Sequence, residues 1–218
     1  MSAASIKPFE TTEGPKQSCR DLICDVAGSE LDQIKKVFTL PSREALCYHT
    51  FTKRYPKAKI ACVEREQNIC ETLWDQGIDC TKTTVREYCN ERKRPEQHHD
   101  IVFLDYYSFL SEDILNDVRA FLANDNILHP GKPFVLALTL AKGMRVHKDA
   151  TLSALQTYVY DGERTGVQND LDAVASALTG MIACDFLDFR DVRLAEAVEY
   201  RASSNSAQMY FVVFVITK

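Results

Sequence analysis

The sequence predicts an α/β protein with three layers, in which a mostly parallel seven-stranded sheet carries helices on both faces. Three observations support this prediction. Short apolar runs alternate with segments of helical periodicity from Val37 onward. The strongest run, 101–104, is apolar throughout between two aspartates, as expected of a strand buried on both faces. The chain closes with two strand-like runs joined by a short polar segment, which predicts a C-terminal antiparallel hairpin.

Each element is expected from its own pattern. Strands are predicted at 37–40, 59–63, 80–85, 100–105, 133–138, 197–201 and 209–217, with a further short strand at 21–26. Helices are predicted at 29–36 and at 86–92, and on four faces formed by Leu46, Cys47 and Phe51; by Ile69, Cys70, Leu73 and Trp74; by Ile114, Leu115, Val118, Phe121 and Leu122; and by Leu171, Val174, Ala175 and Leu178. Ser111 is expected to cap the helix after it, and Gly77 to follow the end of another.

Length and composition indicate one domain. The chain has 218 residues, of which 45% are hydrophobic and 26% charged. We expect residues 1–20, which lack periodicity, to form an N-terminal arm and residues 21–218 to form a single domain. The net charge of −5 gives the protein no basic field for polyanions, so a nucleic-acid partner is possible but unsupported.

The cysteines and the apolar runs favour a soluble cytoplasmic protein. Among eight cysteines, Cys47, Cys62 and Cys70 fall in apolar periodic segments, where a free thiol behaves as a small hydrophobe. The first ten residues lack the apolar stretch of a signal peptide, and the longest apolar run, 210–216, is far short of the ~20 residues that span a bilayer.

Residues at the ends of the strands are the candidates for a binding site. In an open α/β sheet, ligands bind outside the carboxyl ends of the strands, where the strand order reverses. The first four regular strands end at Leu40-Pro41-Ser42, Glu64-Arg65, Thr84-Val85 and Asp105-Tyr106.

From Val37 to Lys218, the order of elements resembles the class I S-adenosylmethionine-dependent methyltransferases, which have a Rossmann-like fold. In this resemblance Glu64 matches the acid that takes the ribose hydroxyls, and Thr84 and Val85 match the residues beside the adenine, with Thr84 where an Asp is usual. Asp105 is similar to the fourth-motif acid, which faces the methionine part and the methyl acceptor. The resemblance implies S-adenosylmethionine as cofactor, held also by Leu40, Pro41, Ser42 and Arg65, and a catalytic role for Asp105 and Tyr106.

The first motif departs from this family. The family carries a glycine-rich turn after the first strand, whereas this chain has Thr39-Leu40-Pro41-Ser42-Arg43. A competing alignment uses 24–30, which offers an Asp and a Gly, but it lies too far from Glu64 for one strand–helix unit. Two interpretations therefore stay open: a methyltransferase with an unidentified acceptor (nucleic acid, small molecule or protein), and an inactive methyltransferase-like binding or scaffold protein. A nicotinamide-dependent dehydrogenase is disfavoured, because no G-x-G-x-x-G follows the first strand.

Other signals are weaker. Tyr106-Tyr107-Ser108 stands where base-methylating relatives carry a Pro-Pro-aromatic run, but the prolines are missing. His98 and His99 precede their strand and point to opposite faces, so no metal is expected. The irregular region 142–166, with Arg145, His147 and Tyr158, is expected to shape acceptor access together with the arm, and Tyr200-Arg201 near Asn205 could line the acceptor mouth.

Overall fold

The computed structural model describes residues 14–91, 98–142, 171–186, 188–201 and 208–218. Its helices are α1 (Pro15–Glu30), α2 (Leu46–Arg54), α3 (Gln67–Asp75), α4 (Val85–Glu91), α5 (Glu112–Leu122) and α7 (Leu171–Asp185). Its strands are β1 (Lys36–Thr39), β2 (Lys59–Glu64), β3 (Cys80–Lys82), β4 (Ile101–Asp105), β5 (Pro133–Ala141), β6 (Asp191–Arg201) and β7 (Gln208–Thr217).

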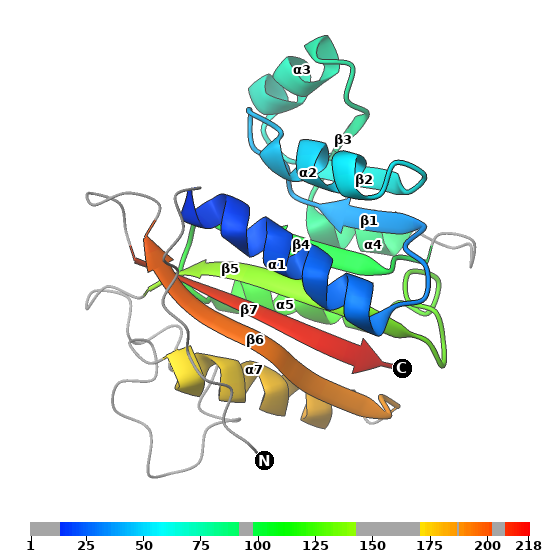
Figure 1. Cartoon of the computed structure of the whole chain (residues 1–218), viewed down its shortest axis with the longest axis vertical. Coiled ribbons are helices and arrows are strands. Elements are labelled where there is room, and N and C mark those ends of the chain that lie inside the picture. The colour runs from blue at the N-terminus through cyan, green and yellow to red at the C-terminus, as the bar shows by residue number, and fades with distance from the viewer. Residues whose placement is uncertain (1–13, 92–97, 143–170, 187, 202–207) are drawn as a thin grey trace.

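The strands form one seven-stranded sheet in the order β3-β2-β1-β4-β5-β7-β6 (Figure 1). The first five strands are parallel, and β7 inserts antiparallel between β5 and β6. The predicted mostly parallel sheet with its C-terminal antiparallel hairpin is therefore confirmed. The strand order reverses between β1 and β4, which are hydrogen-bonded neighbours, so a ligand crevice is expected at their carboxyl ends.

Helices cover both faces of the sheet, and the side chains of β4 show how. Ile101 and Phe103 pack in one apolar cluster with residues of α1 and α2, whereas Val102 and Leu104 pack in another with residues of α4, α5 and α7. Because successive side chains of a strand point to opposite faces, an uninterrupted apolar strand needs a helix layer on each side. Figure 1 shows α1 and α2 in front of the sheet and α5 behind it.

The helix after β4 follows its prediction closely. Ser111 lies at the N-cap of α5, and its hydroxyl accepts a hydrogen bond from the backbone N–H of Ile114 at 3.4 Å. All five residues of the predicted stripe are buried. Gly77, directly after the C-cap of α3, has the positive φ of 75° that favours glycine at such an end.

The region before β1 differs from its prediction. Residues 21–26 are not a strand but lie in the middle of α1, and the helix expected at 29–36 is wrong, because α1 ends at Glu30 and β1 begins at Lys36. The buried Cys19, Ile23 and Ala27 recur every four residues, which is helical spacing. Residues 15–20 of the predicted arm belong to α1, and residues 1–13 lie outside the described part of the chain. The division into arm and single domain stays a prediction.

Smaller differences concern two side chains and one strand. Leu46 and Trp74, expected on buried faces, are 45% and 46% exposed. The Trp74 indole instead donates a hydrogen bond to the carbonyl of Cys80 at 2.9 Å. Strand β6 begins at Asp191, six residues before the predicted start, and the side chains of its first six residues, at the edge of the sheet, are exposed or half-buried. All eight cysteines are free thiols, and seven of them are buried. No helix in the described ranges is long and apolar enough to cross a membrane.

The packing of α1 can be tested with Ile23→Ala. This side chain is fully buried, so its truncation should lower the free energy of unfolding by about 2–5 kcal/mol. Val26→Ala on the same helix is the matched control, and because Val26 is only partly buried its loss should be smaller. Urea denaturation measures both, and equal losses would contradict the observed orientation of α1.

Candidate functional site

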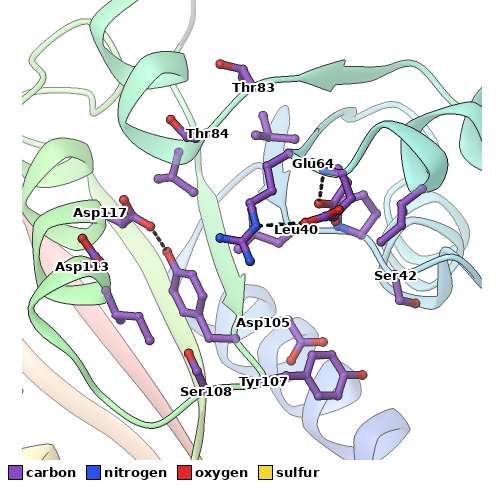
Figure 2. Close-up of a pocket in the computed structure, with 18 of the residues that line it drawn as sticks. Leu40, Ser42, Glu64, Thr83, Thr84, Asp105, Tyr107, Ser108, Asp113 and Asp117 are labelled. Atoms are coloured by element: carbon purple, nitrogen blue, oxygen red, sulfur yellow. Dashed lines mark hydrogen bonds and ion pairs between the residues drawn. The ribbon is translucent and has the colours of Figure 1, made fainter.

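A pocket of about 780 Å³ lies at the carboxyl ends of β1, β2, β3 and β4 (Figure 2). Its volume is within the range of small-molecule and cofactor sites. Every residue predicted at the strand ends lines this one pocket: Leu40, Pro41, Ser42, Glu64, Arg65, Thr84, Val85, Asp105 and Tyr106. The structure thus brings together all the predicted site residues, while the role of each stays a prediction.

The turn between β1 and α2 forms one wall of the pocket without a glycine. The backbone N–H of Ala45 donates to the carbonyl of Ser42 at 3.0 Å, and Ala45 has a left-handed φ of 50°. Such a φ is unusual for a residue with a Cβ. The chain therefore turns into α2 at a buried alanine. A glycine-rich turn would carry no side chain at this position. Residues 24–30 lie in α1, which removes the competing alignment.

Glu64 ends β2 with its carboxylate held in place. Its Oε1 accepts a hydrogen bond from the backbone N–H of Glu66 at 2.9 Å. The neighbouring Arg65 side chain is 78% exposed, and its guanidinium lies 3.5 Å from the Glu66 carboxylate. A fixed carboxylate that stays at the solvent edge is suited to accept hydrogen bonds from hydroxyl groups of a ligand.

Thr84 starts helix α4 through a reciprocal pair of hydrogen bonds. Its hydroxyl accepts from the backbone N–H of Glu87 at 3.2 Å, while the Glu87 carboxylate accepts from the backbone N–H of Thr84 at 3.0 Å. This is a capping box, and its hydrogen bonds hold the pKa of Glu87 below its usual value. The Thr84 hydroxyl is therefore engaged with its own helix, and the buried Val85 adds apolar surface to the pocket.

Asp105 ends β4 in a largely buried position. Burial raises the pKa of its carboxyl group above the usual value, against the opposing effects of the Lys16 ammonium, a hydrogen bond with Thr139 and the Arg20 guanidinium. Lys16 and Arg20 come from α1, one helical turn apart. Neither residue was predicted from the sequence, although the four-residue spacing of Cys19, Ile23 and Ala27 is a signal that could have identified α1.

Tyr106 is held by an acid and an arginine. Its hydroxyl donates to Oδ2 of Asp117 at 2.8 Å, and Oδ1 of Asp117 lies 3.0 Å from Nε of Arg86. The same guanidinium contacts Asp113 at 3.2 Å, so it joins α4 to α5. Burial raises the pKa of both Tyr106 and Asp117. Arg86, Asp113 and Asp117 were not predicted as site residues, and their only signal in the sequence is the i, i+4 spacing of the two aspartates.

The weaker candidates are distributed differently. Tyr107 lines the pocket and is 66% exposed, whereas Tyr200 is buried and close enough to Asp105 for that carboxylate to contribute to its raised pKa. His99 is buried at the amino end of β4, 3.1 Å from the Tyr88 hydroxyl. The described residues contain no group of three or more side chains placed to hold a metal ion. Asn205 and the three acceptor-access residues Arg145, His147 and Tyr158 lie outside the described ranges.

Comparisons with known proteins identify the class of fold. No family model matches the sequence, and no curated protein matches it. Among solved structures, the chain is similar to the N-methyltransferase NodS from Bradyrhizobium japonicum WM9, with a TM-score of 0.53 and 10% identity over 93% of this chain and 97% of that one. An rRNA methylase from Streptococcus thermophilus gives a TM-score of 0.52 and 11% identity over 95% and 99%. The plantazolicin methyltransferase BpumL, in complex with SAH, gives 0.56 and 8% over 92% and 83%.

The protein therefore has the fold of the class I S-adenosylmethionine-dependent methyltransferases, as the sequence predicted. The similarity to NodS extends over 93% of this chain. With identities of 8–11%, it defines the architecture and not the reaction.

Replacing Asp105 should stabilise the protein in a pH-dependent way. Because the pKa of Asp105 is raised by folding, the folded state disfavours the charged carboxylate, and this penalty develops as pH rises from the unfolded value of about 3.9 through the folded value. Asp105→Asn should therefore increase the free energy of unfolding relative to the original protein more at about pH 7 than at about pH 3.

Urea denaturation at the two pH values measures the effect. Asp113→Asn is the matched control, since the Asp113 side chain is 83% exposed and its substitution should change stability little at either pH. A stability gain of Asp105→Asn that is the same at both pH values would contradict the burial of an ionisable carboxyl group at this position.

Proposed function

We propose that this chain is an S-adenosylmethionine-dependent methyltransferase acting on an unidentified acceptor, which is a nucleic acid, a small molecule or a protein. One observation carries the proposal: Glu64 and Asp105, which end separate strands, line one pocket where the strand order of the sheet reverses. The proposal places the protein in the cytoplasm, and its seven buried free thiols support that setting.

The pocket residues fit the parts of the proposed cofactor. Glu64 would hold the ribose hydroxyls, with Arg65 beside it, and Val85 with the backbone of Thr84 would contact the adenine edge. The Leu40-Pro41-Ser42 turn would hold the methionyl end, and Asp105 with Tyr106 the acceptor side. S-adenosylmethionine supplies an electrophilic methyl group on a positively charged sulfonium.

The charges of the pocket also suit that cofactor. Six carboxylates and three guanidinium groups line it. Two of the guanidiniums are already engaged: Arg86 lies between Asp113 and Asp117, and Arg65 pairs with Glu66. A cleft with an excess of one sign concentrates the opposite charge, so this site favours a cationic ligand. The protein's own contribution to methyl transfer would be orientation and exclusion of water.

A scaffold protein without catalysis is the second candidate, and the turn after β1 favours it. That turn contains no glycine, and Pro41 and Ala45 are buried in it. A Cβ and a pyrrolidine ring stand where methyltransferases bring bare backbone close to the cofactor. The two candidates differ in whether the pocket still binds the cofactor.

Calorimetry with S-adenosylmethionine and with its product SAH separates them. We expect both to bind the full chain, and we expect Glu64→Gln to weaken binding by about tenfold or more, because an acceptor for hydrogen bonds loses its charge. Glu71→Gln, on the exposed face of α3, is the matched control and should leave both affinities unchanged. A folded sample that gives no heat with either compound would exclude the methyltransferase and support the scaffold.

A further inference from the structure

Lys16, in the first turn of α1, lies beside Asp105 and Tyr107, two residues that line the pocket. Its ammonium nitrogen lies 3.7 Å from the centre of the Tyr107 ring and donates a hydrogen bond to the Tyr107 hydroxyl. It is also close enough to Asp105 for each group to influence the pKa of the other. Figure 2 shows Tyr107 next to Asp105 at the edge of the pocket. Lys16 therefore contacts the part of the site proposed for the acceptor.

The position is unfavourable for a lysine whose purpose is structural. Lys16 lies in the first turn of α1, where the helix dipole disfavours positive charge, and Arg20 follows one turn later. Burial lowers the pKa of Lys16 below its usual value in spite of the neighbouring Asp105 carboxylate. A lysine amine that is desolvated and lies beside another cation is a stronger nucleophile at neutral pH, because more of it is uncharged.

Lys142 provides a contrast within the same chain. It is similarly half-buried, with a side chain that is 26% exposed, but its ammonium pairs with the Glu199 carboxylate at 3.0 Å. That pair explains Lys142 as a structural ion pair. The neighbours of Lys16 instead include two residues of the pocket, Asp105 and Tyr107.

We propose that Lys16 is a methyl acceptor of this protein's own site, so that the chain methylates itself at the Lys16 side-chain amine. The inference rests on the proposed function and deepens it, because it assigns a nitrogen nucleophile to the Asp105 edge. It also implies that the acceptor side of the pocket binds an amine, which contacts the ring face of Tyr107 and the carboxylate of Asp105.

The transfer balances without another reactant. The uncharged amine nitrogen of Lys16 forms a bond to the methyl carbon of S-adenosylmethionine as the bond from that carbon to sulfur breaks. The electron pair of the broken bond stays on sulfur, which gives the thioether of SAH. The nitrogen then loses one proton, which Asp105 accepts, since its raised pKa makes it a better base than an exposed aspartate.

The first part of the test measures the nucleophilicity of the amine without any methyl transfer. The full chain is treated briefly with N-acetoxysuccinimide, with and without SAH, and the acetylation of each lysine is read by peptide mass spectrometry. We expect Lys16 to react several times faster than Lys142, and SAH to protect Lys16 alone. A rate at Lys16 equal to or below that at Lys142 would overturn the proposal.

The second part measures the transfer. The chain is incubated with S-adenosylmethionine that carries a deuterated methyl group, and its intact mass and peptides are analysed. We expect deuterated methyl on Lys16, none on Lys142, none in Lys16→Arg, and a clearly slower rate in Asp105→Asn. Lys142→Arg is the matched control and should be modified at Lys16 like the original protein.

The outcomes separate the two levels of the proposal. If SAH gives no heat in calorimetry, the proposed function fails. If SAH binds but Lys16 carries no label, the function stands and self-methylation is excluded. If Lys16→Arg instead weakens the binding of SAH while no label appears, Lys16 is a cofactor-binding residue and the proposal is likewise overturned.

Discussion

The burial of β4 on both faces is the constraint on which the rest of the structure depends. Its four apolar residues, Ile101 to Leu104, have no solvent-facing side, so helices must pack against the sheet in front and behind. This buried strand ends at the edge of the sheet, and its last residue is Asp105. The same burial that stabilises the core therefore puts a poorly solvated carboxylate in the lining of the pocket.

The apolar periodicity of the sequence was sufficient to predict the sheet and most helices, because strands and helices that pack against each other need apolar side chains on the faces in contact. It failed before β1, because the four-residue spacing of Cys19, Ile23 and Ala27 extends beyond the apolar stretch 21–26 on both sides. It also failed at Trp74, whose side chain is 46% exposed and whose N–H donates to the carbonyl of Cys80, six residues further along the chain.

The residues of the candidate site likewise include some that the sequence predicted and some that it did not. Residues that end parallel strands were predictable, because the carboxyl ends of those strands meet at one edge. Lys16 and Arg86 were not: Lys16 lies in α1, which the sequence pattern did not predict as a helix, and Arg86 comes from a helix whose rotation about its own axis depends on packing. The hydroxyl of Tyr106 illustrates the limit: the sequence places the ring near the pocket, but only the structure shows its hydrogen bond to Asp117.

The insertion of β7 between β5 and β6 has a consequence for how the protein holds together. β6 has no strand neighbour besides β7 in the described sheet, and α7 packs against β6. If β7 detached, β6 would lose its backbone hydrogen-bonded link to the parallel strands and would be held only by side-chain contacts, such as the ion pair of Arg193 with Glu30 of α1. The strand pairing of β6 therefore depends on one strand, whereas β1 to β4, with the pocket at their ends, keep their mutual pairing without it.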